Sequence, residues 1–500
     1  MAQEKPVQYV VMPPRGVRDD MMLNPILRPA PESKALPAMM MAMSANGLLK
    51  KVTPRIRVID SIHEDGLKLV EMPEEAVRAL RRAMPGVRLV PLVYYQRAEQ
   101  PRARVEKAAK QAAGVTSLQI VLRSKADAKP IVGAHVVAFT DFANRIGAEG
   151  DSNAQGKVTL KLGGLKANLD ALYVYPPHGF WGRYARKLKV SSGDVLTMSP
   201  IDLAIPDFAA ALYPGTPLTA GNGVTVGVLD SGIALNHPDL VVAGGTNTVT
   251  GEQPTDFGPA GDHGSHVAGI IAARGTAPTG VRGIAPGVTL RSYRVFGESA
   301  EGASNFDIAK AVDQATADGC DLLNLSLGGG SPEATLAEAI NDAFQRGVLS
   351  VCAAGNNGRL AVSFPAQLQQ ALAVSALGEK GTFPADAVAA GDIEKPFATS
   401  NARRFIAAFS NIGTEVDLTG PGVGIVSTVP DRAYAVMSGT SMACPAVTGR
   451  IAAMMSQRPD LLASARDDKR TRAIMKLAFD SAKLQGFGAN DAHFEGQGLI

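Results

Sequence analysis

The chain has 500 residues, too many for one hydrophobic core, so we expect two to four domains. Hydrophobic residues make up 46% and charged residues 19%, the balance of an ordinary globular protein. The net charge of +3 at pH 7 is close to neutral and gives no reason to expect nucleic acid or an anionic membrane as a partner. The absence of a run of 18 apolar residues argues against a membrane-spanning helix.

The first 16 residues carry prolines and charges where a secretory signal would be apolar. We therefore expect a cytoplasmic protein unless a targeting segment precedes this sequence. The cysteines are three in number and lack metal-ligand spacing, which favours reduced packing residues over a disulfide framework. They are Cys320, Cys352 and Cys444.

Residues 1–97 predict a small α+β domain. An amphipathic helix over 73–84 begins with Pro73 and two glutamates, as the first turn of a helix prefers. Four segments read as strands, and their order around the helix is that of a split βαβ sheet. These strands are 8–12, 55–62, 66–72 and 87–95.

Residues 98–113 are charged and rich in alanine, which predicts a linker or a solvated helix. Residues 114–203 then alternate between apolar and polar positions, as at Leu118, Ile120 and Leu122, and predict a small antiparallel β-sandwich. The runs 130–136 and 153–158 resemble prealbumin-like sandwich modules. A generic spacer sandwich is an equally good interpretation.

Residues 204–500 predict an α/β domain. Its strands are apolar throughout and alternate with helical patterns, which is typical of a parallel sheet with helices on both faces. Active sites in such sheets lie beyond the carboxyl ends of the strands. The predicted strands are 224–229, 290–296, 322–325, 348–353 and 371–376, and the predicted helices include 267–273, 308–316 and 336–344.

Four residues of this domain could together hydrolyse a peptide bond. Asp230 ends a predicted strand, His263 lies in a turn that leads into an apolar helix, and Asn356 follows another strand. Ser441 enters a helix in which Pro445 suits the first turn, so its backbone N–H is free to bind negative charge. Each residue alone has an ordinary structural interpretation: a turn aspartate, a packing histidine, an Asn–Gly turn and an N-cap serine.

Together, the four blocks resemble the subtilisin-like serine peptidases, including that family's chain order of Asp, His and Ser. The resemblance covers residues 204–500. It implies a serine endopeptidase with a catalytic triad of Asp230, His263 and Ser441, and an oxyanion hole formed by Asn356 and the Ser441 N–H. It also implies protein or peptide substrates and a binding cleft that includes Ser326, Leu327, Gly328, Ala353, Ala354, Gly355 and Ser363.

The first domain resembles a subtilisin propeptide, which implies an intramolecular inhibitor and a self-processing zymogen. We expect a cut between about Tyr94 and Ala113, so that the sandwich stays on the mature enzyme. A cut within 206–223, or no cut, are the competing hypotheses.

Some residues depart from the family pattern. The loop 274–281 lacks the asparagines that bind calcium in many relatives, although Asp239 matches one ligand position. We therefore expect no metal site and no required cofactor, with calcium a weaker alternative. Two rival functions are a catalytically silent binding protein and an exopeptidase. Silent members of the family usually lose a triad residue or the oxyanion asparagine, whereas this sequence keeps all four of these residues.

Overall fold

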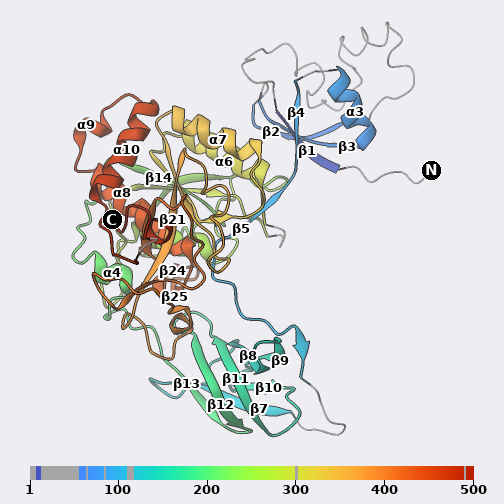
Figure 1. The fold of residues 1–500 in the computed structure, drawn as a ribbon, viewed down its shortest axis with the longest axis vertical. Coiled ribbons are helices and arrows are strands. Elements are labelled where there is room, and N and C mark those ends of the chain that lie inside the picture. Colours follow the sequence, from blue (N-terminus) through green and yellow to red (C-terminus); the bar gives the residue numbers. More distant parts are fainter. Residues whose placement is uncertain are drawn as a thin grey trace.

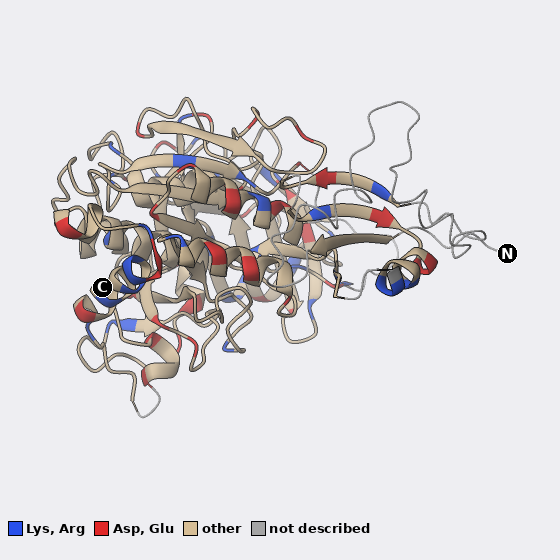
Figure 2. Cartoon of the chain, turned by 90° about the horizontal axis from the view of Figure 1, so that it is seen from above, with Lys and Arg blue, Asp and Glu red and all other residues tan. Residues whose placement is uncertain are grey.

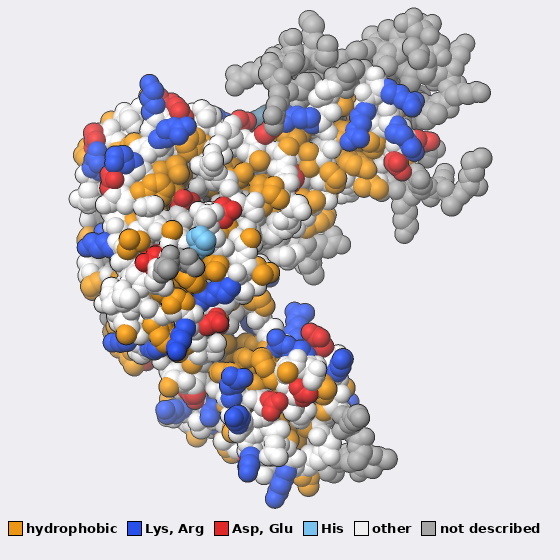
Figure 3. Space-filling view, in the orientation of Figure 1, with side chains coloured by type: hydrophobic (Ala, Val, Ile, Leu, Met, Phe, Trp, Pro, Cys, Tyr) orange, Lys and Arg blue, Asp and Glu red, His pale blue; other side chains and the backbone are white. Residues whose placement is uncertain are grey.

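The computed structural model describes residues 7–12, 56–63, 66–83, 86–109, 117–298, 302–488 and 491–500. The described chain forms three bodies (Figure 1). An N-terminal lobe (residues 7–93) and a sandwich (residues 117–203) lie against the C-terminal domain (residues 204–500) at separate places. The molecular outline is hollowed between the lobe and the sandwich (Figure 3).

The C-terminal domain is built on an eight-stranded sheet, which confirms the predicted α/β class. Its central strands are parallel, while β22 pairs antiparallel with β21, and β23 is a second, parallel neighbour of β21. Apart from β23, the strands follow the order β15-β16-β14-β18-β20-β21-β22. Their bounds are β14 (Thr225–Asp230), β15 (Val242–Asn247), β16 (Thr289–Arg294), β18 (Leu322–Leu325), β20 (Leu349–Ala353), β21 (Ala371–Glu379), β22 (Arg404–Ile406) and β23 (Leu418–Pro421).

Helices cover both faces of this sheet, so its strands are apolar on both sides, as predicted (Figure 1). Helices α5 (His263–Ala272) and α8 (Thr440–Met455) belong to one core, and α6 (Asn305–Ala317) and α7 (Ala334–Gln345) to the other. The smaller elements are α4 (Phe208–Leu212), η1 (Val388–Asp392), α9 (Pro459–Leu462), α10 (Asp468–Ser481), α11 (Asp491–Glu495) and a hairpin of β24 (Ile425–Val429) and β25 (Ala433–Met437).

The start of α8 differs from the prediction. Pro445 does not occupy the first turn; it lies inside a helix that already begins at Thr440. A proline cannot donate to the carbonyl four residues earlier, which here belongs to Ser441. That carbonyl accepts a hydrogen bond from the Ser326 hydroxyl instead, at 2.9 Å, so the helix continues without an unpaired acceptor at this point.

The N-terminal lobe is a four-stranded antiparallel sheet with one described helix. Its strand order is β2-β3-β1-β4, and residues 13–55 lie outside the described residues. The lobe packs on α6 and α7, where Val10, Met12 and Leu69 form one apolar cluster with Phe306. The elements are β1 (Val7–Met12), β2 (Arg57–Ser61), β3 (Lys68–Met72), α3 (Glu74–Ala83) and β4 (Arg88–Pro91).

Charged contacts surround this apolar interface. Lys310 of α6 binds Asp60 at 2.6 Å, His63 binds Asp313 at 2.7 Å, and Arg88 pairs with Glu338 of α7. The lobe is therefore held on the C-terminal domain by burial of apolar side chains and by ion pairs around them.

The sandwich consists of two small sheets, β10-β7-β13 and β12-β11-β8-β9-β6. Most pairs are antiparallel, as predicted, but β13 pairs parallel with β7 and β6 pairs parallel with β9. Both exceptions arise because the chain arrives from another body or sheet rather than through a hairpin. The bounds are β6 (Lys107–Ala108), β7 (Leu118–Ser124), β8 (His135–Asp141), β9 (Ile146–Asp151), β10 (Lys157–Leu160), β11 (Lys166–Tyr175), β12 (Arg183–Ser191) and β13 (Val195–Met198).

The segment between the lobe and the sandwich is extended where the structure describes it, so the solvated-helix interpretation is wrong for residues 98–109. Strand β5 (Tyr94–Arg97) crosses the C-terminal domain, and the chain then continues to β6 of the sandwich (Figure 1). We call residues 99–109 the connecting arm. Basic and acidic side chains are interspersed over the ribbon rather than gathered by sign (Figure 2). Among the described residues, no helix is both long and apolar enough to cross a membrane.

Candidate active site

Asp230 and His263 meet at the carboxyl end of the central strand β14. Asp230 is the last residue of this strand and His263 the first of α5, so the sheet and the helix fix both backbones. The imidazole Nδ1 lies 2.8 and 2.9 Å from the two Asp230 carboxylate oxygens, and both side chains are buried. The Ser231 N–H also donates to Asp230, at 2.7 Å, which orients the carboxylate.

This pairing controls the charge state of His263. Burial alone would lower its pKa, but the neighbouring Asp230 carboxylate outweighs burial and raises the pKa above the ordinary histidine value. Nδ1 therefore carries its proton toward Asp230, and Nε2 is left as the basic nitrogen. Nε2 is buried and has no hydrogen-bond partner among the described residues.

Ser441 is the second residue of α8, where helix geometry leaves its N–H without an intrahelical acceptor. Its hydroxyl donates to the Ser326 carbonyl at 3.0 Å rather than to His263.

Asn356 follows β20 and is oriented by Thr440, a residue that the sequence interpretation did not assign. The Thr440 N–H and hydroxyl both donate to Asn356 Oδ1, each at 2.9 Å. Because Oδ1 is held in this way, the orientation of the amide is fixed and Nδ2 remains as a donor for another group. The Ser441 N–H and the Asn356 amide thus form a pair of donors that converge on one point.

The chain's own Ala98 carbonyl occupies that point. It accepts the Ser441 N–H at 3.1 Å and the Asn356 Nδ2–H at close range. The Ala98 N–H donates to the Ser326 carbonyl at 3.0 Å, and two residues later the Gln100 N–H donates to the Ser438 carbonyl at 2.9 Å. The peptide bond between Ala98 and Glu99 is therefore held on both sides, beside the serine.

Strand β5 lies between two edge strands of the C-terminal domain. Tyr94 and Tyr95 pair with β17 (Ala303–Ser304), and Gln96 and Arg97 pair with β19 (Leu327–Gly328), both antiparallel. An extended peptide thus completes a three-stranded sheet, as in other cases of strand addition.

Glycines permit this close approach at two places. A Cβ atom at Gly302 would lie 2.5 Å from the Tyr95 carbonyl oxygen, and one at Gly439 would lie 2.6 Å from the Ala98 carbonyl oxygen. Any larger residue at either position would push the bound strand away from the cleft.

Tyr95 fills an apolar pocket in the C-terminal domain and is 0% exposed. Its ring contacts Phe364, with 6.0 Å between centroids, and its hydroxyl donates to Glu333 at 3.3 Å. Burial, and secondarily the Glu333 carboxylate, raise the pKa of Tyr95 above its ordinary value, so the phenol stays neutral.

Three of the predicted cleft residues interact with this bound strand, and the others lie near these three or in the same apolar clusters. Ser326, Leu327 and Gly328 hydrogen-bond to it as described above, while Ala353 shares an apolar cluster with Ala98, and Ala354 shares one with Tyr95. Ser363 donates its N–H to the Ala354 carbonyl at 2.8 Å, and its hydroxyl accepts from Asn411 at 3.1 Å. A Cβ atom at Gly355 would clash with the Ser363 hydroxyl, so Gly355 and Ser363 are direct neighbours.

His266, the second histidine of the α5 block, has a structural role. Its Nε2 donates to the carbonyls of Ile425 and Ala435, at 3.1 and 3.2 Å. Burial lowers its pKa to about 3, so it stays neutral in the first turn of α5, beside His263. All three cysteines are buried and unpaired, as the spacing indicated.

Asp239, the residue that matches a calcium ligand, is engaged by protein donors. Its carboxylate accepts from the Val281 N–H and the Tyr434 hydroxyl, both at 2.9 Å. A Cβ atom at Gly275 or at Gly280 would lie within 3 Å of the same carboxylate, so the loop 274–281 closes tightly over it. The described residues contain no cluster of three or more acidic, histidine or cysteine side chains suited to a metal.

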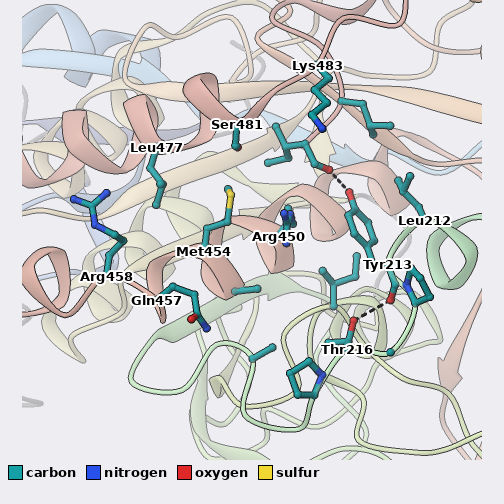
Figure 4. A pocket seen from close by; sticks show the side chains of 18 of the residues that line it. Leu212, Tyr213, Thr216, Arg450, Met454, Gln457, Arg458, Leu477, Ser481 and Lys483 are labelled. Atoms are coloured by element: carbon teal, nitrogen blue, oxygen red, sulfur yellow. Dashed lines mark hydrogen bonds between the residues drawn. The ribbon is translucent and has the colours of Figure 1, made fainter. Parts of the chain in front are cut away.

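A cavity of about 860 Å³ lies elsewhere, between α4, α8, α10 and the last residues of the chain (Figure 4). Its lining includes Leu212, Tyr213, Arg450, Met454 and Leu477, and none of the candidate catalytic residues. The Tyr213 hydroxyl donates to the Ile500 carbonyl across it (Figure 4). The strand-binding cleft, rather than this cavity, contains groups suited to chemistry.

Comparison with known proteins gives separate evidence on the family of the C-terminal domain. A model of the Subtilase family matches residues 221–498. Subtilisin BL of Lederbergia lenta is 41% identical over 239 residues, which are 48% of this chain and 78% of that protein. Subtilisin DY of Bacillus licheniformis is 35% identical over 284 residues, which are 56% and 89% of the two chains. Alkaline elastase YaB of Bacillus sp. (strain YaB) is 38% identical over 265 residues, or 53% and 62%.

Proposed function

The chain belongs to the subtilase family of serine endopeptidases, and we propose that it is made as an inactive precursor that cuts itself between Ala98 and Glu99. One observation carries this proposal. The Ala98 carbonyl accepts both donors of the candidate oxyanion hole, and the strand that precedes it is paired on both edges.

The proposed reaction is acyl transfer to Ser441 and then to water. The Ser441 hydroxyl rotates toward His263, gives its proton to Nε2, and its oxygen attacks the Ala98 carbonyl carbon. The oxyanion that forms is stabilised by the Ser441 N–H and the Asn356 amide. Breaking the C–N bond releases the Glu99 amine, which takes the proton from His263, and a water molecule then hydrolyses the acyl-enzyme.

Asp230 acts through the imidazole. It holds the Nδ1–H, so that Nε2 is the nitrogen that accepts the proton, and it stabilises the imidazolium that results. Thr440 acts through Asn356 and is a positioning residue, because both of its donors fix the orientation of the amide.

The competing cut within 206–223 has less support. That segment contains α4, whose N-cap Asp207 accepts the Ala210 N–H at 2.8 Å and the Val426 N–H at 2.6 Å. A cut there requires these bonds to break before the segment reaches Ser441. A cut at Ala98 requires no such rearrangement.

The same geometry supports a substrate preference. The residue before the scissile bond is small in the bound strand, and the residue three positions earlier is the buried Tyr95. We propose that substrates are peptides with a small residue at the first position and an aromatic residue at the fourth, counted back from the cut. Ala98 itself is buried at the first position, and the pocket beside Phe364 takes the aromatic ring.

Purified wild-type and Ser441→Ala proteins test the proposal. We expect a wild-type N-terminus at Glu99 by sequencing and mass spectrometry, and an intact chain for Ser441→Ala with a similar thermal unfolding midpoint. A mature N-terminus beyond Leu203, or cutting of Ser441→Ala at the wild-type rate, would contradict it.

A further inference from the structure

Asp392 is a buried acid that the mechanism does not use. It is the last residue of the short helix η1, in a part of the C-terminal domain remote from the triad in sequence, and it is 4% exposed. Burial raises the pKa of its carboxyl well above the ordinary value. Its backbone carbonyl accepts the Ala408 N–H at 2.9 Å, which holds the end of η1 in place.

The carboxyl has a single described partner, and this partner comes from the bound strand. Gln100 Nε2 donates to Asp392 Oδ1 at 2.6 Å, while Oδ2 is buried and has no hydrogen-bond partner among the described residues. Asp392 forms no ion pair with any lysine or arginine that the structure describes. A buried carboxyl with an unused oxygen is costly, and a donor supplied by the substrate lowers this cost.

The position of Gln100 is fixed by its backbone. It is the second residue after the Ala98 carbonyl, and its N–H binds the Ser438 carbonyl at 2.9 Å, three residues before Ser441. A cavity of about 330 Å³ adjoins it, lined by residues of the sandwich and of the C-terminal domain that include Tyr175, Trp181, Ala387 and Met437. This part of the cleft is therefore built by both bodies.

We propose that Asp392 determines specificity at the second position after the scissile bond, where it selects a side chain that ends in an N–H donor. The class of residue is an amide or a cation: glutamine, asparagine, lysine or arginine. Glutamate at this position would face a second carboxyl, and leucine would leave Asp392 without a partner. The inference rests on the proposed cut at Ala98, which defines the register.

Lysine and arginine fit the same geometry for a further reason. Their additional N–H groups can reach Oδ2 as well as Oδ1, which glutamine does not do here. The ionised form of Asp392 has only acceptor oxygens, and a cationic side chain bound beside it favours this form. The neutral form adds one O–H donor, but its carbonyl oxygen still accepts an N–H such as that of Gln100. A site that hydrogen-bonds to a substrate donor discriminates strongly against a substrate that lacks the donor. An apolar pocket discriminates less strongly against a substrate of slightly different size.

Peptides of the sequence Tyr-Gln-Arg-Ala-Glu-X-Pro-Arg test the proposal, with X as Gln, Lys, Leu or Glu and with a fluorophore and quencher at the ends. For the mature wild-type enzyme we expect kcat/KM for X = Gln or Lys to exceed that for X = Glu by about tenfold or more. In the Asp392→Asn variant, the kcat/KM values for X = Gln or Lys and for X = Glu should differ by no more than about threefold. The ratio compares two substrates of one enzyme preparation, so it does not depend on how much of the variant folds.

Asp386→Asn is the matched control. It makes the same substitution at a residue six positions earlier, whose described ion pair is with Arg183, at 3.6 Å. It should keep the wild-type ratio. Equal ratios in wild-type and Asp392→Asn, or a wild-type enzyme that cuts X = Glu as well as X = Lys, would overturn the proposal.

A second experiment needs no change at Asp392. Precursors with Gln100→Lys and Gln100→Glu are followed by gel electrophoresis, and the Lys variant should process itself about tenfold faster or more. Equal rates would overturn the inference. If no precursor cuts itself while the peptides are still hydrolysed with the expected ratio, the proposed self-processing fails and the role of Asp392 stands.

Discussion

The aromatic pocket at Tyr95 makes a quantitative prediction for substrate binding. A tyrosine side chain buries about 150–250 Å² of surface, which at about 25 cal/mol per Å² corresponds to about 4–6 kcal/mol. This is an upper bound, because an unbound peptide already covers part of the ring and alanine keeps part of the contact. We take about half, or about 2–3 kcal/mol. At 1.36 kcal/mol for each factor of ten, replacing the tyrosine by alanine should lower kcat/KM about 30- to 150-fold.

Peptide p-nitroanilides provide the assay. The pair Tyr-Gln-Arg-Ala and Ala-Gln-Arg-Ala measures the effect of the ring, and Phe-Gln-Arg-Ala isolates the hydroxyl. Its hydrogen bond to Glu333 is long, at 3.3 Å, so phenylalanine should stay within about fivefold of tyrosine. Tyr-Ala-Arg-Ala is the matched control, because Gln96 is exposed in the bound strand and its replacement should cost less than about threefold. A loss below about threefold for Ala-Gln-Arg-Ala relative to Tyr-Gln-Arg-Ala would refute the assignment of the pocket.

Three further predictions concern the catalytic groups. Thr440→Val, which removes one of two donors to Asn356 while keeping the shape, should lower kcat about tenfold with little change in KM in steady-state assays; an unchanged kcat would contradict its positioning role. Only neutral His263 can serve as base, and its pKa is raised above 6.5, so kcat/KM should be high above that pKa and fall as the pH drops through it. A profile of kcat/KM against pH that is flat down to pH 6 would contradict this prediction. EDTA should leave most activity intact, since Asp239 is bonded to Val281 and Tyr434; complete loss that calcium restores would show a required site.

The sequence predicted the framework of the site well because local chemistry determines it. Asp230 ends a strand that is apolar on both faces, and His263 begins a helix of small and apolar residues, so each lies where an α/β sheet exposes side chains. The boundaries of the five strands predicted in the C-terminal domain shifted by only a few residues, but the strand predicted over 87–95 is wrong, because β4 and β5 are separate strands of different sheets. Helix α8 was placed less well, since its first turn depends on the contact of Thr440 with Asn356, which are 84 positions apart.

The occupant of the cleft could not be predicted from its own residues. Residues 98–113 show no apolar period, and the extended form of residues 98–109 comes from bonds to Ser326, Ser438 and the sandwich rather than from local preference. The role proposed for Asp392 depends on Gln100, which is 292 positions away. Neither set of contacts can be read from a single sequence. Which residue of the segment 98–109 faces which residue of the cleft depends on how the lobe, the sandwich and the C-terminal domain pack together.

That docking explains how one peptide bond can be singled out. On the side before the cut, the N-terminal lobe is fixed to α6 and α7 by the Phe306 cluster, and β5 leads directly from it into the cleft. On the side after the cut, the connecting arm is fixed to the sandwich, where Tyr175 accepts the Ala103 N–H at 2.9 Å and Ala109 donates to Gly147 at 2.9 Å. Each anchor restricts the chain, so in the proposed reaction the bond between Ala98 and Glu99 would meet Ser441 with little further loss of entropy.

The same two anchors also determine the fate of the products after the proposed cut. Hydrolysis separates Ala98 from Glu99 but removes none of the contacts that hold the lobe on α6 and α7 or the arm on the sandwich. Under the proposed cut, both new chain ends begin as bound products, and we expect the separated lobe to block the cleft until it dissociates or is degraded. Release of the lobe, rather than the cut itself, should then limit the appearance of activity. If activity toward a p-nitroanilide substrate rises in step with the appearance of the Glu99 N-terminus, without a lag, this order of events is wrong.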